Sequence, residues 1–325
     1  MNRRIELEER LKEDQLGKRL DKAIAELFPN FSRSRLKEWL ISGKITLDGK
    51  VVTKPREKVT CCKDVVILTE LQDESCWKAQ DIPLNIVYED RDIIVLNKPG
   101  DFIVHPGAGR PDGSVLNALL FHHPEAALLP RAGIVHRLDK DTTGLMVVAK
   151  TISAYTGLVD ALQRREVTRE YEAITSGSMI GGGTVNKPIA RHRRKRTLMA
   201  VSTTGKAAIT YYRVAERFRE YTRIILRLGT GRTHQIRVHM SYIQYPLFAD
   251  KTYGRSARVP VGASETLTQR IHSFDRQALH AKMLRFEHPT SGERVEFHAP
   301  VPDDMRALLE AFRDDVQKNP VLLTQ

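Results

Sequence analysis

The sequence lacks long apolar runs and has few cysteines. None of its apolar stretches approaches the ~20 consecutive residues that a membrane-spanning helix needs, and residues 1–10 are too charged for the core of a signal peptide. The cysteines Cys61, Cys62 and Cys76 form no Cys-x-x-Cys pair, which disfavours a disulfide framework and a structural zinc site. We therefore expect a cytoplasmic protein without a membrane partner.

Signatures of nucleotide cofactors and metals are also missing. The glycine-containing loop at residues 107–113 lacks the Gly-Lys-Ser/Thr ending of a P-loop and the Gly-x-Gly-x-x-Gly spacing of a dinucleotide site. His234 and His239 are five residues apart and do not share a helix face, and no His-Glu-x-x-His motif is present. We expect no metal site, which disfavours a metal-dependent nuclease.

Positive charge is what the chain has in excess. Its 52 Lys and Arg residues against 40 Asp and Glu residues give a formal net charge of +12, which favours a polyanionic partner such as nucleic acid. The densest cationic run, RHRRKR at residues 191–196, cannot be buried unpaired and is either a solvated loop or a contact for phosphates. With this net charge we favour RNA contact through Arg193, Arg194 and Arg196.

Residues 16–68 have the pattern of a small basic module. Helical spacing of apolar residues predicts one helix from Leu16 to about Phe28 and a second through residues 35–41, and the Asp48-Gly49 turn predicts a hairpin after them. This order resembles the S4 RNA-binding module, which implies that the second helix and the hairpin offer positive charge to structured RNA. The candidate contacts are Arg33, Arg35, Lys37, Lys44 and Lys50. A solvated face would carry the same charges without a ligand.

Changes in pattern along the chain predict its division into parts. We expect a charged leader at residues 1–15, the S4-like module at 16–68, a polar linker at 69–81 and a second domain at 82–325. Short strands greatly outnumber helices in the second domain, and many are hairpin-like, so we predict an α+β fold on a largely antiparallel, mixed sheet. The basic stretch at 255–276 is poorly periodic, and the sequence assigns no role to it.

One loop of the second domain concentrates reactive side chains. The stretch HRLDKDTTG at residues 136–144 is polar at nearly every position and runs directly into the apolar segment 145–149. A charged loop beside a buried strand is held rigidly, and the neighbouring Arg137 and Lys140 favour an ionised Asp139. Asp and Thr before Gly also form ordinary turns, so the residues alone leave a structural interpretation open.

The loop, with the strand after it, resembles the active-site motif of the RluA family of pseudouridine synthases, in which the aspartate is essential. Two further segments match the family. In TREYEAI at 168–174, Tyr171 stands where the family has a tyrosine that stacks on the target base. In GTGRTHQIRVHM at 229–240, Arg237 stands where the family has an arginine that pairs with the catalytic Asp139, and we expect Thr233 to cap a helix there.

The resemblance implies a set of substrate contacts as well. Arg137 matches the residue that fills the space left by the flipped base. His136 and Thr142, in the same loop, are further candidate contacts with the substrate. We therefore expect Asp139, Tyr171 and Arg237 to form the catalytic centre.

The resemblance also implies the reaction. A uridine in RNA is isomerised to pseudouridine, with no cofactor, by breaking the glycosidic bond and rejoining the base to the ribose through carbon. The chain is most similar to family members that act on large-subunit (23S) ribosomal RNA, which implies a target in the stem-loop facing the small subunit and an added role in large-subunit assembly. We expect a monomer.

Several alternatives stay open at the level of sequence. Three roles of Asp139 are possible: it attacks the ribose, it attacks the base, or it removes a proton from the ribose. Transfer RNA is the alternative substrate, and a non-catalytic ribosome-binding or assembly factor is the alternative class of protein.

Overall fold

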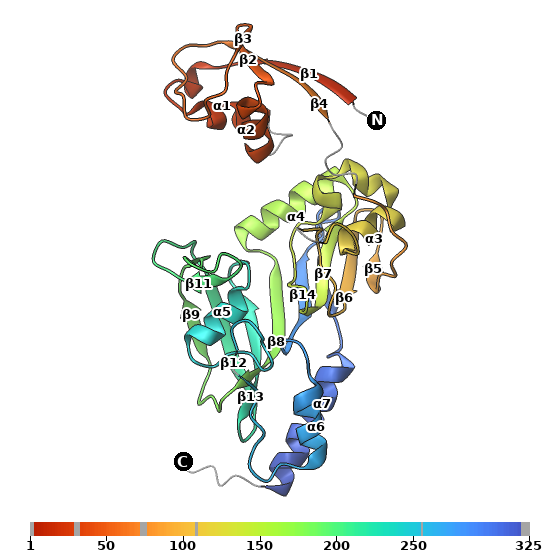
Figure 1. The fold of residues 1–325 in the computed structure, drawn as a ribbon. Helices are drawn as coiled ribbons and strands as arrows, with labels where there is room; N and C mark the ends of the chain where they lie inside the picture. The colour runs from red at the N-terminus through yellow and green to blue at the C-terminus, as the bar shows by residue number, and fades with distance from the viewer. Residues whose placement is uncertain (1–2, 29–32, 72–76, 108–109, 255, 320–325) are drawn as a thin grey trace. The chain divides into compact units, whose positions relative to one another are not determined.

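The computed structural model describes residues 3–28, 33–71, 77–107, 110–254 and 256–319, with the backbone alone at 3–5, 33–35 and 70–71. The chain divides into two units, Met1–Cys76 and Trp77–Gln325, and each is described by itself (Figure 1). No helix in the described ranges is long and apolar enough to cross a membrane.

The first unit packs two helices against a four-stranded sheet of order β1-β4-β2-β3. Its elements are β1 (Arg3–Arg10), the 3₁₀ helix η1 (Glu13–Gln15), α1 (Leu20–Leu27), α2 (Arg33–Ile41), β2 (Ile45–Leu47), β3 (Lys50–Val51) and β4 (Asp64–Leu71). Leu36, Trp39 and Leu40 of α2 are buried in a core shared with Ile45 and Ile67. The predicted second helix is thus confirmed, and so is the hairpin, whose turn has positive φ at Asp48 and Gly49.

The leader and the linker are shorter than we expected. Residues 3–10 form β1, which pairs antiparallel with β4 along its whole length, and Leu7 packs against the core. We did not predict this strand from the sequence, because it lies at a sheet edge, where charged side chains are common. The predicted linker at 69–81 gives its first residues to β4 and its last to the second unit, where Trp77 packs against the core and Gln80 N donates to Asn117 O (3.0 Å).

The second unit is built on a nine-stranded sheet of order β5-β6-β7-β14-β8-β13-β12-β9, with β15 paired to β14. Its strands are β5 (Ile86–Glu89), β6 (Ile93–Lys98), β7 (Thr143–Ala149), β8 (Thr168–Ser176), β9 (Gly183–Asn186), β12 (Ile209–Arg217), β13 (Tyr221–Leu228), β14 (Leu279–Glu287) and β15 (Arg294–His298). Neighbours are antiparallel except β7 and β14, which are parallel. The predicted α+β fold with a largely antiparallel, mixed sheet is confirmed.

Helices cover this sheet on both faces. They are α3 (Val115–His122), α4 (Ile152–Arg164), α5 (Gln235–Tyr242), α6 (Glu265–Ser273) and α7 (Asp303–Lys318), with 3₁₀ helices η2 (Pro124–Leu128) and η3 (Pro130–Gly133). Alternate residues of β6 enter two cores, so α4 packs on one face with Ile93 and α3 on the other with Ile94 (Figure 1). The unassigned stretch 255–276 contains α6, which packs against α7 through Leu267 and Ile271.

The basic run is the loop of a separate two-stranded hairpin, β10 (Ile189–Arg191) and β11 (Met199–Val201). Arg193, Arg194 and Arg196 are exposed there. Because these cations are exposed to solvent, the protein avoids the free-energy cost of burying unpaired charges. The same exposure leaves the charges available to phosphates.

Candidate active site

A cleft with a volume of about 530 Å³ opens in the second unit beside the loop at 136–142. Its walls come from that loop, from β8, from the end of α4 and from the segment 228–237. Its lining is strongly basic, with Arg131, Arg137, Arg165, Arg169, Arg232 and Arg237. Among the described residues that line the cleft, Asp139 is the only carboxylate. The wall therefore suits a polyanion and holds one acidic group.

The loop that carries Asp139 is fixed from several sides. Leu138 is 3% exposed and packs in the core with Tyr171. Thr142 N donates to Asp139 O (3.1 Å), which closes a turn. At Gly144, φ is +109° and a Cβ atom would lie 2.2 Å from Ala281 O, so only glycine lets β7 approach β14 here. These contacts aim the Asp139 side chain into the cleft.

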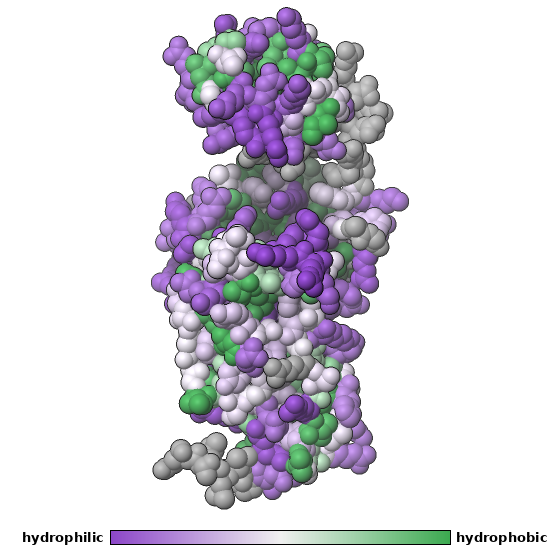
Figure 2. Space-filling model, turned by 60° about the vertical axis from the view of Figure 1, so that its left-hand side comes forward, coloured by the Kyte–Doolittle hydropathy of each residue, from purple (hydrophilic) through white to green (hydrophobic). Residues whose placement is uncertain are grey.

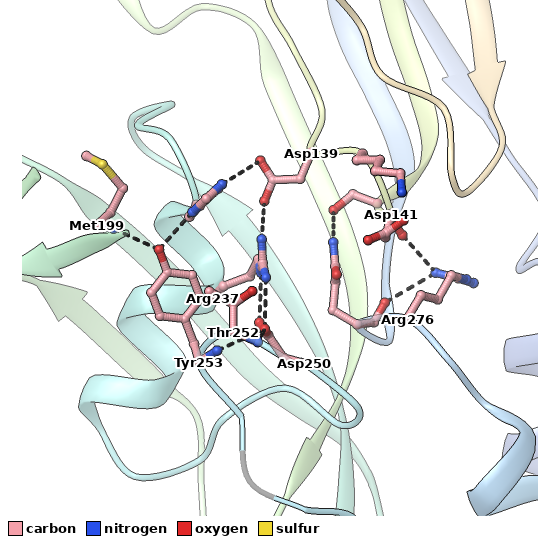
Figure 3. Close-up of polar contacts among 12 residues, drawn as sticks. Asp139, Asp141, Met199, Arg237, Asp250, Thr252, Tyr253 and Arg276 are labelled. Carbon is pink, nitrogen blue, oxygen red and sulfur yellow. Dashed lines mark hydrogen bonds and ion pairs between the residues drawn. The ribbon is translucent and has the colours of Figure 1, made fainter. Parts of the chain in front are cut away.

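Arg237 lies between two carboxylates (Figure 3). Its Nη1 donates to Asp139 Oδ2 (3.1 Å), and its Nε and Nη2 donate to Asp250 Oδ2 (2.7 Å) and Oδ1 (2.8 Å). Asp250 also accepts from the backbone N–H groups of Thr252 and Tyr253. The expected pairing of Arg237 with Asp139 is present, and Asp250, which sequence reasoning missed, fixes the arginine from behind.

The charges of this buried pair stabilise each other. Burial alone would lower the pKa of Arg237, but Asp250 and then Asp139 raise it above its ordinary value. Burial alone would raise the pKa of Asp250, but the hydrogen bonds and charge of Arg237 hold it below its ordinary value. Arg237 is therefore a fixed positive charge in contact with Asp139.

A second side chain approaches Asp139 from the segment before α5. His234 Nε2 lies 3.9 Å from Asp139 Oδ1, and His234 Nδ1 is hydrogen-bonded to the Tyr253 hydroxyl (2.7 Å), which accepts from Met199 N (Figure 3). Burial lowers the pKa of His234, which favours the neutral ring. Our prediction that Thr233 caps the helix is wrong. The N-cap is His234, whose φ of 54° is rare for a non-glycine residue and aims its ring at Asp139.

Tyr171 lies in the same cleft as Asp139, on β8. It is 5% exposed, and Arg169 lies two residues before it on the same face of the strand. Burial and the charge of Asp139 raise the pKa of Tyr171 although Arg169 opposes them, so the phenol stays protonated at neutral pH. The structure thus brings Asp139, Tyr171 and Arg237 into one basic cleft.

The loop residues that we predicted as substrate contacts have different surroundings. Arg137 is exposed at the cleft. His136 Nε2 accepts from Val147 N (3.1 Å), and burial lowers its pKa to about 3, so this neutral ring is occupied in holding the loop to β7. Thr142 is 2% exposed and its hydroxyl accepts from Gln277 Nε2 (3.1 Å), which leaves little of it for a ligand.

The RNA contacts predicted on the first unit are described within that unit. Lys37, Lys44 and Lys50 are exposed on the first unit, whose visible face is largely hydrophilic (Figure 2). The side chains of Arg33 and Arg35 lie outside the described residues. No group of three or more described His, Cys, Asp or Glu side chains is placed to hold a metal ion.

Lys98 is a further residue that the sequence did not single out. It is 2% exposed, and its Nζ donates to the carbonyl oxygens of Pro99 (2.6 Å), Phe102 (2.8 Å) and Lys140 (2.8 Å). The last bond joins β6 to the Asp139 loop. Burial lowers the pKa of Lys98 to about 7, although Asp141 and Asp139 act in the opposite direction.

This gives a pH-dependent prediction for Lys98→Met. Between pH about 7 and about 10 the unfolded chain binds more protons at Lys98 than the native chain, so native stability rises with pH in that window. We expect the free energy of unfolding of the wild type, relative to Lys98→Met, to increase from pH 7 to pH 9.5. Urea unfolding at several pH values measures it. Lys140→Met serves as control, because the half-exposed Lys140 pairs with Asp101 at the surface, and an equal trend in both variants would contradict the assignment.

Comparisons with known proteins give one consistent result. Residues 92–242 match the family described as RNA pseudouridylate synthase, and residues 18–66 match the S4 domain. The chain is 68% identical over 319 residues to a ribosomal large subunit pseudouridine synthase D from Vibrio vulnificus and 58% identical over 319 residues to that of Escherichia coli K12, with 98% of each chain covered. The solved structure of human RNA pseudouridylate synthase domain containing 4 is 25% identical, with a TM-score of 0.56, and the match covers 70% of this chain and 93% of that one.

Proposed function

The chain belongs to the RNA pseudouridylate synthase family, and from this premise we propose that it isomerises uridines to pseudouridine in large-subunit ribosomal RNA. The substrate is the one that the names of its bacterial relatives state. The observation that carries the proposed chemistry is the contact of Asp139 with the buried, charge-fixed Arg237 in a basic cleft.

Asp139 supplies the reactive carboxylate in this proposal. The glycosidic bond between N1 and C1′ breaks, a bond between C5 and C1′ forms, and the proton of C5 leaves while N1 regains one. Nothing is oxidised or reduced, so a carboxylate that acts as nucleophile or base suffices. Arg237 orients that carboxylate and places a positive charge beside it, and His234 lies next to its other oxygen.

The target uridine must leave its stack to reach Asp139, because a paired base is inaccessible. Tyr171 forms the wall on which the flipped base stacks, an interaction worth roughly 1 to 3 kcal/mol per base. Arg137, exposed at the cleft, is placed to enter the gap that the base leaves. His136 and Thr142 hold the loop that carries Arg137 and Asp139.

Affinity for RNA comes largely from charges outside the cleft in this proposal. Replacing Arg193, Arg194 and Arg196 of the hairpin loop by Gln removes three exposed cations. If each contacts one phosphate, the slope of log affinity against log salt concentration becomes shallower by about 2 to 3. Fluorescence anisotropy of a labelled stem-loop RNA, titrated at several salt concentrations, measures this slope.

The control for that experiment is an equal loss of charge elsewhere. Arg294, Arg306 and Lys318 are exposed in β15 and α7, and their triple Gln variant keeps the wild-type slope. A slope that changes equally in both triple variants would mean that net charge, and not the hairpin loop, sets the affinity.

Pseudouridine mapping decides the substrate. In total RNA from cells that lack this gene, we expect specific positions of large-subunit RNA, in the stem-loop that faces the small subunit, to remain uridine. The purified protein restores them. Loss confined to transfer RNA would replace the proposed substrate, and unchanged modification with defective ribosome assembly would favour an assembly factor.

A further inference from the structure

Arg169 is a buried cation that finds no partner within the described chain. It is 9% exposed and lines the cleft, and its Nε is sealed from solvent without a hydrogen bond. No hydrogen bond or ion pair joins its guanidinium to any described residue. Buried charges in proteins are almost always paired, because desolvation of an unpaired charge is costly. The missing partner is therefore a group that arrives from outside.

The protein keeps space for this guanidinium. A Cβ atom on Gly231 would lie 2.7 Å from Arg169 Nη1. The φ angle of Gly231 is not in the left-handed region, so its backbone conformation does not require glycine, but a side chain there would force the Arg169 guanidinium to move from its present position. Burial lowers the pKa of His136 and raises that of Tyr171, and the charge of Arg169 adds to the first shift and opposes the second. Arg169 thus lines the reaction cleft at a position that Gly231 leaves open.

The chemistry of the missing partner follows from the cleft lining. Asp139, its one described carboxylate, already pairs with Arg237. An anion for Arg169 must then come with the ligand, and a planar guanidinium matches a phosphate group through two parallel hydrogen bonds. Arg169 precedes Tyr171 by two residues on one face of β8, which separates them by about 7 Å. A phosphate next to a base stacked on Tyr171 can reach it.

We propose that Arg169, in the space kept by Gly231, binds a backbone phosphate adjacent to the target uridine. This inference rests on the proposed function and adds a positioning contact to it. When RNA binds, its phosphate supplies the negative charge that pairs with Arg169. This contact positions the target nucleotide relative to Asp139.

The test compares Arg169→Met with Arg169→Lys and with Arg164→Met. Arg164 is exposed and pairs with Glu166, outside the cleft lining, so it controls for loss of an arginine. We expect KM for a stem-loop RNA to rise about 10- to 100-fold in Arg169→Met, to recover partly in Arg169→Lys and to stay at the wild-type value in Arg164→Met. The melting temperature of Arg169→Met does not fall, because no internal partner is lost. A KM equal to that of Arg164→Met overturns the proposal.

Neutral linkages identify the phosphate. A 2′-deoxy methylphosphonate is placed at each linkage around the target uridine, with the 2′-deoxy phosphodiester as control. One adjacent methylphosphonate raises the wild-type KM but does not raise that of Arg169→Met further. If every linkage acts equally on both proteins, Arg169 contacts a uracil carbonyl or nothing, and the phosphate site is refuted.

Gly231→Ala gives an independent arm. The added methyl group displaces the Arg169 guanidinium, so we expect Gly231→Ala to weaken RNA binding when Arg169 is present. In a protein that already carries Arg169→Met, we expect Gly231→Ala to change RNA binding little. Both pairs are measured by anisotropy with Asp139→Asn also present, so the result needs no turnover. If the wild type does not convert uridine to pseudouridine, the proposed function is contradicted. If Gly231→Ala weakens RNA binding equally with and without Arg169→Met, the Arg169 site is contradicted.

Discussion

Replacing Asp139 by Asn is expected to lower the rate of pseudouridine formation by more than about 10⁴-fold, which is the scale of losing an essential nucleophile or base. The amide keeps the shape of the side chain but removes its negative charge and its reactive lone pair. Arg237 retains its two bonds to Asp250, so the cleft stays assembled. Tritium release from RNA labelled at C5 of uridine measures turnover.

Binding separates the loss of chemistry from loss of the site. We expect Asp139→Asn to bind the stem-loop RNA within about threefold of the wild type, because phosphate contacts dominate affinity. Asp141→Asn is the matched control, since Asp141 lies in the same loop but does not line the cleft. Substantial tritium release by Asp139→Asn, or an equal loss in Asp141→Asn, would refute the assignment of Asp139.

Replacing Asp250 by Asn is expected to damage both stability and turnover. Arg237 is 7% exposed, and removing one partner of a buried ion pair costs about 3 to 5 kcal/mol. The guanidinium also loses the bonds that orient it toward Asp139, so kcat falls. Because Arg237 lowers the pKa of Asp250, the wild-type advantage is full above pH about 4 and is lost as pH falls below it. Urea unfolding at pH 7 and pH 3.5 measures the stability difference, and tritium release from labelled RNA at pH 7 measures kcat.

Glu172→Gln is the control for Asp250→Asn. Glu172 is 1% exposed and accepts from Arg223 Nε (2.7 Å) and Nη2 (3.1 Å), so it is also one partner of a buried pair. It does not line the cleft. We expect Glu172→Gln to lower stability while kcat of the folded fraction stays near the wild-type value. A comparable loss of kcat in both variants would mean that Asp250 acts through stability alone.

Much of the fold was predictable because its signals are local. Alternation along β8 puts Arg169 and Tyr171 on one face, and helical spacing in α7 puts Met305 and Phe312 in the core. The strand β1 escaped prediction because its charged edge positions conceal the pairing with β4, some 60 positions later in the chain.

The site divides in the same way. Its motif residues Asp139 and Arg237, 98 positions apart, were expected to meet because a family resemblance supplied the pairing. No motif or family resemblance in the sequence singled out Asp250 or Lys98. A buried aspartate and a buried lysine become recognisable only when the residues that surround them are known.

The reactive loop, the alternation of the strands and the excess of positive charge can be recognised in the sequence, since each is a property of neighbouring residues or of composition. Which charges are paired depends on the folded structure. The fold joins Arg237 to Asp250, whereas the Nε of Arg169, beside Gly231, has no hydrogen-bond partner among the described residues, because burial and distance depend on strands that are far apart in the chain. The Asp139 loop thus came from sequence, and the surroundings that control it came from the fold.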